Sequence, residues 1–172
     1  ACANITIENN KVHTTASNGD DGNHAAIAAI SILPRGYKAV TNVLIQNNEV
    51  YTTGSTGIYA SSGVNGTTSS GMIVRNNYLH DIGGDVILAI NSEAPLVEYN
   101  VVESSHVRSL QWCVAIWSFN CDNAVIQYNE SFNTKTTIDG QGFDSDYQCH
   151  NSLFQYNYAH NNEGGFLLIC CE

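Results

Sequence analysis

One short motif recurs six times along this 172-residue chain. Each copy reads apolar, any residue, apolar, polar, Asn or Tyr, then Asn, and the copies end at Asn10, Asn48, Asn77, Asn100, Asn129 and Asn157. The spacings between these residues are 38, 29, 23, 29 and 28. Because the motif stays constant while the spacing varies, we expect one invariant corner in each repeat, followed by loops of different length.

A second apolar run follows each of the last five corners, in the segments TGIYAS, GDVILAI, CVAIWSF, QGFDSDY and GGFLLICC. Two strands, an Asn corner and a variable loop in each repeat predict one coil of a parallel β-helix. The corner Asn residues should then stack, each in the left-handed conformation. A propeller blade needs four strands in about 40 residues or more, and most of these periods are shorter. The sequence therefore predicts an all-β, right-handed parallel β-helix of about six coils with an Asn ladder.

Composition and charge narrow the classes of function. The chain has 21 Asn and 14 Gly but only 2 Pro, which is typical of many tight turns. With 6 Lys and Arg against 16 Asp and Glu, the net charge is −10, which excludes a nucleic-acid binder that neutralises phosphates. No apolar run approaches the roughly 18 residues of a membrane span, and the N-terminal residues do not resemble a signal peptide.

The ends of the chain bear on its domain organisation. Residues 1–172 read as one β-helix domain that opens inside a repeat and stops inside a strand. Both terminal coils would be uncapped, whereas solenoids normally carry caps. We therefore expect a fragment of a longer protein.

Three cysteines share one position in the repeat. Cys2, Cys121 and Cys149 each lie eight residues before a corner Asn, where other coils place small residues such as Ser69 and Ser92. Neighbouring rungs lie about 4.8 Å apart, so Cys121 and Cys149 should touch. A buried stack of thiols and a disulfide are both compatible with that separation.

The second strands suggest where chemistry could take place. If Ile58, Val86, Val114, Phe143 and Phe166 point inward, the alternation of a strand turns Ser145 and Tyr147 inward as well. Asp144 and Asp146 then face outward, in the same column as Ala115 and Trp117 one coil earlier and Leu167 and Ile169 one coil later. Carboxylates beside an indole are typical of a sugar subsite, since sugar CH groups pack on aromatic rings and carboxylates bind hydroxyls.

Two further acids should join this pair. Asp139 lies in the loop before the strand, and Glu163 occupies a similar place one coil later, so Asp139, Asp144, Asp146 and Glu163 form a candidate catalytic cluster. Closely spaced carboxylates raise one another's pKa, which supplies the protonated acid beside an ionised partner that glycoside hydrolysis requires. A calcium site and plain surface solvation are the alternatives.

Four other side chains are candidates for binding a sugar. Trp117 should face outward, and Trp112 precedes the same strand. His150 lies beside a turn and His160 follows the last corner, so each could bind a hydroxyl, although a histidine on a loop is more often simply a surface residue. Cys170 and Cys171 are adjacent and should point to opposite faces of a strand, which disfavours a shared zinc site.

The segment DGQGFDSDYQCHNSLFQYNYAHNNEGGFLL resembles bacterial β-helix proteins of the pectate-lyase-like superfamily, many of which are secreted glycan-degrading enzymes. Within that group the pattern is similar to glycoside hydrolase family 136, the lacto-N-biosidases, whose two catalytic aspartates lie seven residues apart. Asp139 and Asp146 have this spacing. The resemblance implies that one of them is the acid/base and the other the nucleophile. The NTD, GHG and RIK signatures of polygalacturonases are absent.

We therefore expect a secreted or cell-surface glycoside hydrolase that acts on an oligo- or polysaccharide, with a neutral glycan favoured over a charged one. It should need no cofactor, apart from an optional structural calcium ion, and should contact neither nucleic acid nor membrane; its oligomeric state is open. A polysaccharide lyase would need a basic residue near the acids, and only Lys135 qualifies. The competing class is a non-catalytic solenoid such as an adhesin, a fibre segment or a carbohydrate-binding scaffold. The gathering of four acids within residues 139–163 favours an enzyme over such a scaffold.

Overall fold

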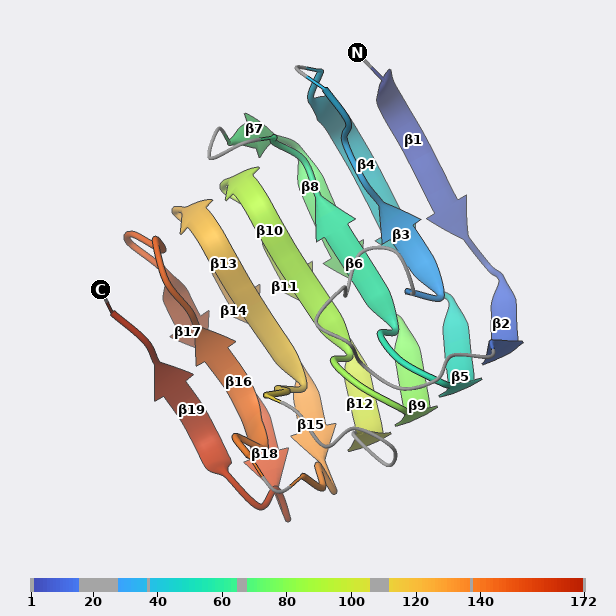
Figure 1. Cartoon of the computed structure of the whole chain (residues 1–172), viewed down its shortest axis with the longest axis vertical. Coiled ribbons are helices and arrows are strands. Elements are labelled where there is room, and N and C mark those ends of the chain that lie inside the picture. The colour runs from blue at the N-terminus through green and yellow to red at the C-terminus, as the bar shows by residue number, and fades with distance from the viewer. Residues whose placement is uncertain are drawn as a thin grey trace.

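The computed structural model shows an all-β chain that winds into a stack of coils (Figure 1). It describes residues 2–15, 28–36, 38–64, 68–105, 112–136 and 138–171. Within these residues each turn passes through sheet A, sheet B and sheet C before it returns to sheet A. The described part of the chain contains no helix with the length and hydropathy needed to cross a bilayer.

Three parallel sheets run along the stack. Sheet A consists of β1 (Cys2–Glu8), β4 (Val40–Gln46), β8 (Met72–Arg75), β11 (Leu96–Glu98), β14 (Val125–Gln127) and β17 (Leu153–Gln155). Sheet B consists of β2 (Lys11–Thr15), β5 (Glu49–Thr53), β9 (Tyr78–Ile82), β12 (Val101–Ser105), β15 (Glu130–Phe132) and β18 (Tyr158–His160). Sheet C consists of β3 (Ile30–Ile32), β6 (Ile58–Ser61), β10 (Ile87–Glu93), β13 (Ile116–Asp122), β16 (Gln141–Ser145) and β19 (Gly165–Ile169), with β7 (Ser69–Ser70) also paired to β10.

The corner between sheets A and B contains a continuous column of Asn side chains. The amide and Nδ2 of Asn100 both donate to Oδ1 of Asn129 at 3.0 Å, and Nδ2 of Asn129 donates to the carbonyl of Val97. The same pattern joins the other five, Asn10, Asn48, Asn77, Asn129 and Asn157, to their neighbours. Each side chain therefore forms hydrogen bonds with backbone groups at a bend, where a neighbouring strand offers them no partner.

The left-handed residue at this corner is not the ladder Asn, as the sequence analysis expected, but the residue before it. Asn9, Asn47 and Asn76 have φ between 54° and 59°, and Tyr99, Tyr128 and Tyr156 have φ of 54° or 55°. A positive φ turns the chain sharply and directs the next side chain inward, where it meets the ladder. Asn at this position is favourable, while Tyr needs compensation from its surroundings.

The inner faces of the sheets form the core. In sheet C the inward column is Ile30, Ile58, Ile87, Ile116, Phe143 and Leu167. Ile58 and Phe143 match the expected column. Val86 is buried in the core as expected, but Ile87 takes its place in the column, and the expectation was wrong for Val114 and Phe166, which lie outside the core cluster. The chain enters each strand of sheet C from a loop of different length, so counting from an apolar residue misplaced the register by one or two positions. Tyr147, also expected inward, lies beyond the end of β16 and is 38% exposed.

The cysteine column lies where the repeat placed it. Cys2 pairs with Val40, Ser69 with Ser92, and Ser92 with Cys121, while the bridge between Asp122 and His150 sets Cys149 beside Cys121. All six cysteines are free thiols in this structure. Cys121 is buried, and its thiol lies 3.3 Å from the carbonyl of Ala89.

Candidate functional site

The acidic residues of β16 and its flanking loops meet on the outer face of sheet C. Two adjoining cavities of about 200 and 310 Å³ open there. Both are lined by Trp112, Asp139, Asp144 and Asp146. The smaller one adds Asp85, Val114 and Trp117, and the larger one adds Tyr147, Leu168 and Cys170. Three of the four acids expected to converge therefore share one site with both tryptophans.

Asp144 occupies the centre of this site. It lies between Trp117 on β13 and Leu168 on β19, and it is only 4% exposed although strand alternation turns it away from the core. Ala115, Leu167 and Ile169 were expected beside Asp144, but in the observed register they are not its strand partners. Burial, and then the charges of nearby acids, raises the pKa of Asp144 to about 8. This carboxyl group is therefore protonated at neutral pH.

Asp146 is held differently. Its Oδ1 accepts the amide of Tyr147 at 2.7 Å, and the thiol of Cys170 lies within 4.8 Å of its carboxylate. Burial and the surrounding carboxylates raise the pKa of Cys170 to about 11, so the thiol keeps its proton. The Asp146 side chain is thus oriented by a backbone N–H.

Asp139 reaches the site from a strained turn. It has φ of 67° and pairs with Cys113 one coil earlier, and the following Gly140 has φ of 83°. Gly164 of the next coil packs directly on the carbonyl of Asp139. Desolvation, with smaller contributions from Asp85 and Asp146, raises the pKa of Asp139. The turn thus holds an acid with a raised pKa at the rim of both cavities.

Asp85 is a site residue that the sequence analysis missed. It is completely buried, and its Oδ1 accepts the amide of Val114 and the indole N–H of Trp117, each at 3.0 Å. Asp85 therefore fixes the ring of Trp117 in the wall of the smaller cavity. A signal was present: Asp85 stands two residues before Ile87, as Val114 stands two before Ile116, so a correct register would have placed them on adjacent rungs.

The two tryptophans have different surroundings. Trp117 is half-buried and anchored by Asp85, whereas Trp112 is 69% exposed at the rim shared by both cavities. An anchored ring and an open ring on either side of a group of carboxyls suit the apolar faces and the hydroxyls of a sugar.

Glu163 and the two histidines are not among the described residues that line these cavities. The carboxylate of Glu163 accepts the amide of Thr136 at 3.1 Å and lies 3.6 Å from Nζ of Lys135, so it is directed to the loop before Asp139. Glu163 was expected in the site because of its position along the chain. That position does not fix the direction of a side chain on a turn.

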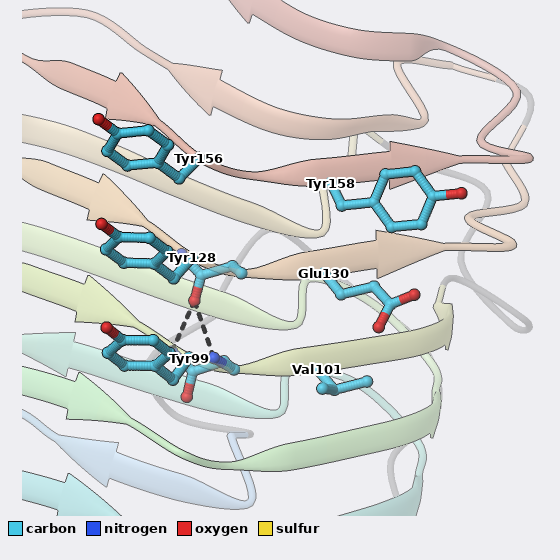
Figure 2. Close-up of a pocket in the computed structure, with 8 residues that line it drawn as sticks. Tyr99, Val101, Tyr128, Glu130, Tyr156 and Tyr158 are labelled. Atoms are coloured by element: carbon cyan, nitrogen blue, oxygen red, sulfur yellow. Dashed lines mark hydrogen bonds between the residues drawn. The ribbon is translucent and has the colours of Figure 1, made fainter.

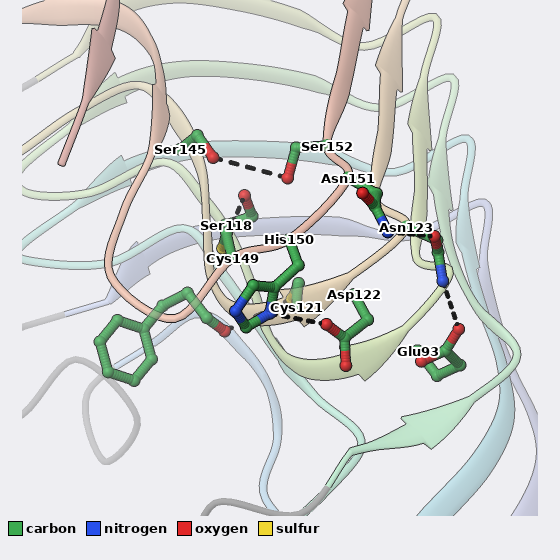
Figure 3. Close-up of polar contacts among 11 residues, drawn as sticks. Glu93, Ser118, Cys121, Asp122, Asn123, Ser145, Cys149, His150, Asn151 and Ser152 are labelled. Atoms are coloured by element: carbon green, nitrogen blue, oxygen red, sulfur yellow. Dashed lines mark hydrogen bonds and ion pairs between the residues drawn. The ribbon is translucent and has the colours of Figure 1, made fainter. Parts of the chain in front are cut away.

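His150 and His160 make polar contacts with acidic side chains elsewhere on the surface. Nδ1 of His150 lies 2.8 Å from Asp122 beside the cysteine column (Figure 3). His160, in sheet B, lies 3.2 Å from Glu130 and stacks on Phe132 and Tyr158. Neither histidine takes part in the acidic site.

A different cavity follows the corner between sheets A and B (Figure 2). Its volume is about 410 Å³, and it is lined by Tyr99, Asn100, Val101, Tyr128, Asn129, Glu130, Tyr156 and Tyr158. The rings of Tyr99, Tyr128 and Tyr156 stack with centroids 4.9 Å apart. The dipeptide Tyr-Asn in the last three motifs is the sequence signal for this stack, which compensates for placing Tyr at a positive φ.

A metal ion has one possible place among the described residues. Asp144, Asp146 and Cys170 offer ligand atoms that all lie within 4.8 Å of one another. Calcium takes six to eight oxygen ligands, whereas this set contains a protonated carboxyl group and a protonated thiol. The donor set therefore fits the expected structural calcium ion poorly.

Comparison with known proteins agrees with this architecture. Residues 1–170 match the family described as the right handed beta helix region. The chain belongs to this family. Over 118 residues, or 59% of the chain, it is 32% identical to a lacto-N-biosidase of Bifidobacterium longum subsp. longum, of which that match covers 7%.

Solved structures show the same fold. The native crystal structure of a GH136 lacto-N-biosidase from Eubacterium ramulus superposes with a TM-score of 0.70 at 21% identity, and its selenomethionine derivative with a TM-score of 0.68 at 20%. Each alignment covers 99% of this chain and 34% of the crystallised one. This right-handed β-helix chain therefore spans about a third of the solved relatives and a small part of the Bifidobacterium protein.

Proposed function

We propose that this β-helix carries the active site of a glycoside hydrolase that cleaves a neutral oligosaccharide, with Asp139 and Asp146 as the catalytic pair. The observation that carries the proposal is the meeting of these two carboxyl groups with Trp112 and Trp117 around adjoining cavities on sheet C. Similarity to a lacto-N-biosidase supports an oligosaccharide as the substrate class.

The surroundings of the two aspartates suggest their roles. Asp146 accepts a hydrogen bond from the Tyr147 amide, which orients its carboxylate toward the cavities that it lines. It is therefore suited to be the nucleophile. Asp139 lacks such donors among the interactions described above, and its raised pKa suits a group that must protonate the departing oxygen. Asp146 would attack the anomeric carbon while Asp139 protonates the departing oxygen, and the ionised Asp139 would then activate the water that releases the sugar from Asp146, without a cofactor.

Charge favours a neutral substrate. The site gathers Asp85, Asp139, Asp144 and Asp146, and the whole chain has a net charge of −10, so a polyuronate would be repelled. Lys135, the basic residue that a lyase would require, is paired with Glu163 at 3.6 Å. An oligosaccharide outside the cell would meet the enzyme only if it is secreted or displayed, and we propose that location.

The test compares Asp139→Asn and Asp146→Asn with the unchanged protein on a panel of neutral oligosaccharides, by release of reducing ends. Each substitution should lower kcat by about a thousandfold or more, because each removes a group that acts in the transition state. Asp122→Asn is the matched control, since Asp122 lies in the neighbouring strand but pairs with His150 away from the site. Full activity in both site variants, or no turnover of any glycan by the unchanged protein, would favour a non-catalytic scaffold.

A further inference from the structure

We infer that Asp144 is a third functional group of this site, a neutral carboxylic acid whose O–H donates a hydrogen bond to an oxygen atom of the bound sugar. The inference rests on the proposed function, since the sugar is the one positioned by Asp139 and Asp146. It assigns Asp144 a role other than acid or nucleophile in the reaction.

The first support is that Asp144 is buried without compensation. Its side chain is 4% exposed between Trp117 and Leu168, and its Oδ1 has no hydrogen-bond partner among the described residues. A buried polar atom without a partner is costly, and native structures keep one where it has a function, such as a role in catalysis. Because Asp144 lines both cavities, a ligand bound in either one would be within its reach.

The second support is the charge around it. The groups that act on Asp144 are Asp146, Asp139, Cys149 and Asp85, and the thiol of Cys170 lies within 4.8 Å of its carboxyl group. All of these are acids, so none supplies a positive charge that would favour the ionised form of Asp144. Burial adds to this, since a desolvated carboxyl group beside carboxylates retains its proton.

Asp85 provides an internal contrast. It is as deeply buried as Asp144, but its Oδ1 receives two N–H groups, from Val114 and Trp117. Asp85 therefore acts as an acceptor that holds the wall of the cavity in place. Asp144 receives no such donor at its buried oxygen, so it is equipped to donate.

A neutral donor at this position implies an acceptor on the ligand. Sugar hydroxyls and the carbonyl oxygen of an acetamido group both accept such a bond, whereas a carboxylate sugar would be repelled by the neighbouring Asp139 and Asp146. Asp144 would thus help to select a neutral sugar and to orient it between the catalytic pair.

The experiment compares two variants of the same position on the glycan that the protein hydrolyses. Asp144→Asn keeps a neutral donor of the same size, so kcat/KM should remain within about tenfold of the unchanged protein. Asp144→Leu removes the donor but suits an apolar site, so the protein should fold with an unchanged or higher Tm and lose about 10- to 100-fold in kcat/KM. An Asn variant as inactive as Asp139→Asn would show that Asp144 acts in its ionised form, and a fully active Leu variant would show that it makes no contact with the sugar. Either result overturns the inference.

The protonation state is measured independently of turnover. In protein labelled with ¹³C at aspartate carboxyl carbons, the resonance missing from Asp144→Asn identifies Asp144. It should keep the chemical shift of a protonated acid at pH 6. An ionised Asp144 at pH 6, together with inactive Asp139→Asn and Asp146→Asn variants, would refute this inference and leave the proposed function intact. Absence of turnover in the unchanged protein would refute both the proposed function and the sugar contact.

Discussion

Replacing Asn129 by Ala should destabilise the protein more than any exposed Asn substitution. Asn129 is 1% exposed, and its side chain makes four hydrogen bonds: two accepted from Asn100, one donated to Val97 and one donated to Asn157. After the substitution, Nδ2 of Asn100 retains the carbonyl of Val74, and Oδ1 of Asn157 retains the amide of Asn129. The amide of Asn100 and the carbonyl of Val97 each lose the hydrogen bond that the Asn129 side chain supplies. At about 1 to 3 kcal/mol for each buried group, the free energy of unfolding should fall by about 2 to 6 kcal/mol.

The matched control is Asn10→Ala. Asn10 is exposed, its side chain only donates in the stack, and Oδ1 of Asn48 keeps the amide of Asn10 after the change. This variant should lose less than about 1 kcal/mol. Urea unfolding followed by circular dichroism measures both values. If Asn129→Ala lost no more stability than Asn10→Ala, the ladder would not contribute as its hydrogen bonds imply.

Two further changes test the packing and the ionisation of the site. Gly164→Ala would place a methyl group against the carbonyl of Asp139, so it should lower both activity and Tm. In the control Gly84→Ala, the nearest neighbour of the new methyl group would be 3.4 Å away, so the free energy of unfolding should change by less than about 1 kcal/mol. A Gly164→Ala enzyme with unchanged kcat and Tm would contradict this packing. Since the pKa of Asp144 is raised to about 8 in the folded protein, against about 3.9 when unfolded, its contribution to stability is full below pH 4 and is lost as pH rises towards 8. Between pH 5 and pH 7 the unchanged protein should therefore lose about 2 to 3 kcal/mol more stability than Asp144→Asn. Parallel pH profiles from urea unfolding would show that Asp144 is not protonated.

The repeat predicted the architecture because it reports local geometry. An Asn at the same place in each motif is visible in the sequence, and it gives the parallel coil. The expectation of two strands per coil was wrong, because the short strands of sheet B directly after the corner were not recognised. The inward column of sheet C was not visible, because the loops entering β10, β13 and β19 differ in length and shift the pairing. Aligning Val114 with Phe143 placed Trp117 beside Asp146, whereas Trp117 pairs with Asp144, two positions earlier.

The parts of the site that escaped prediction depend on contacts between coils. Alternation correctly turned Asp144 away from the core but could not show that Trp117 and Leu168 cover it. The anchoring of Trp117 by Asp85 joins residues 32 positions apart. Glu163, His150 and His160 were chosen by residue type and position along the chain, and their side chains find partners in Lys135, Asp122 and Glu130 instead.

The central claim is that the site adds water across a glycosidic bond, and isotope labelling tests it most directly. The protein is incubated with a neutral oligosaccharide in ¹⁸O-labelled water, and the fresh products are analysed by mass spectrometry. Hydrolysis assisted by Asp139 and Asp146 predicts one heavy oxygen atom on the newly formed reducing end, and no such product from Asp146→Asn. An unsaturated product without the label, which an eliminating lyase would give, or no product from any neutral oligosaccharide would contradict the account.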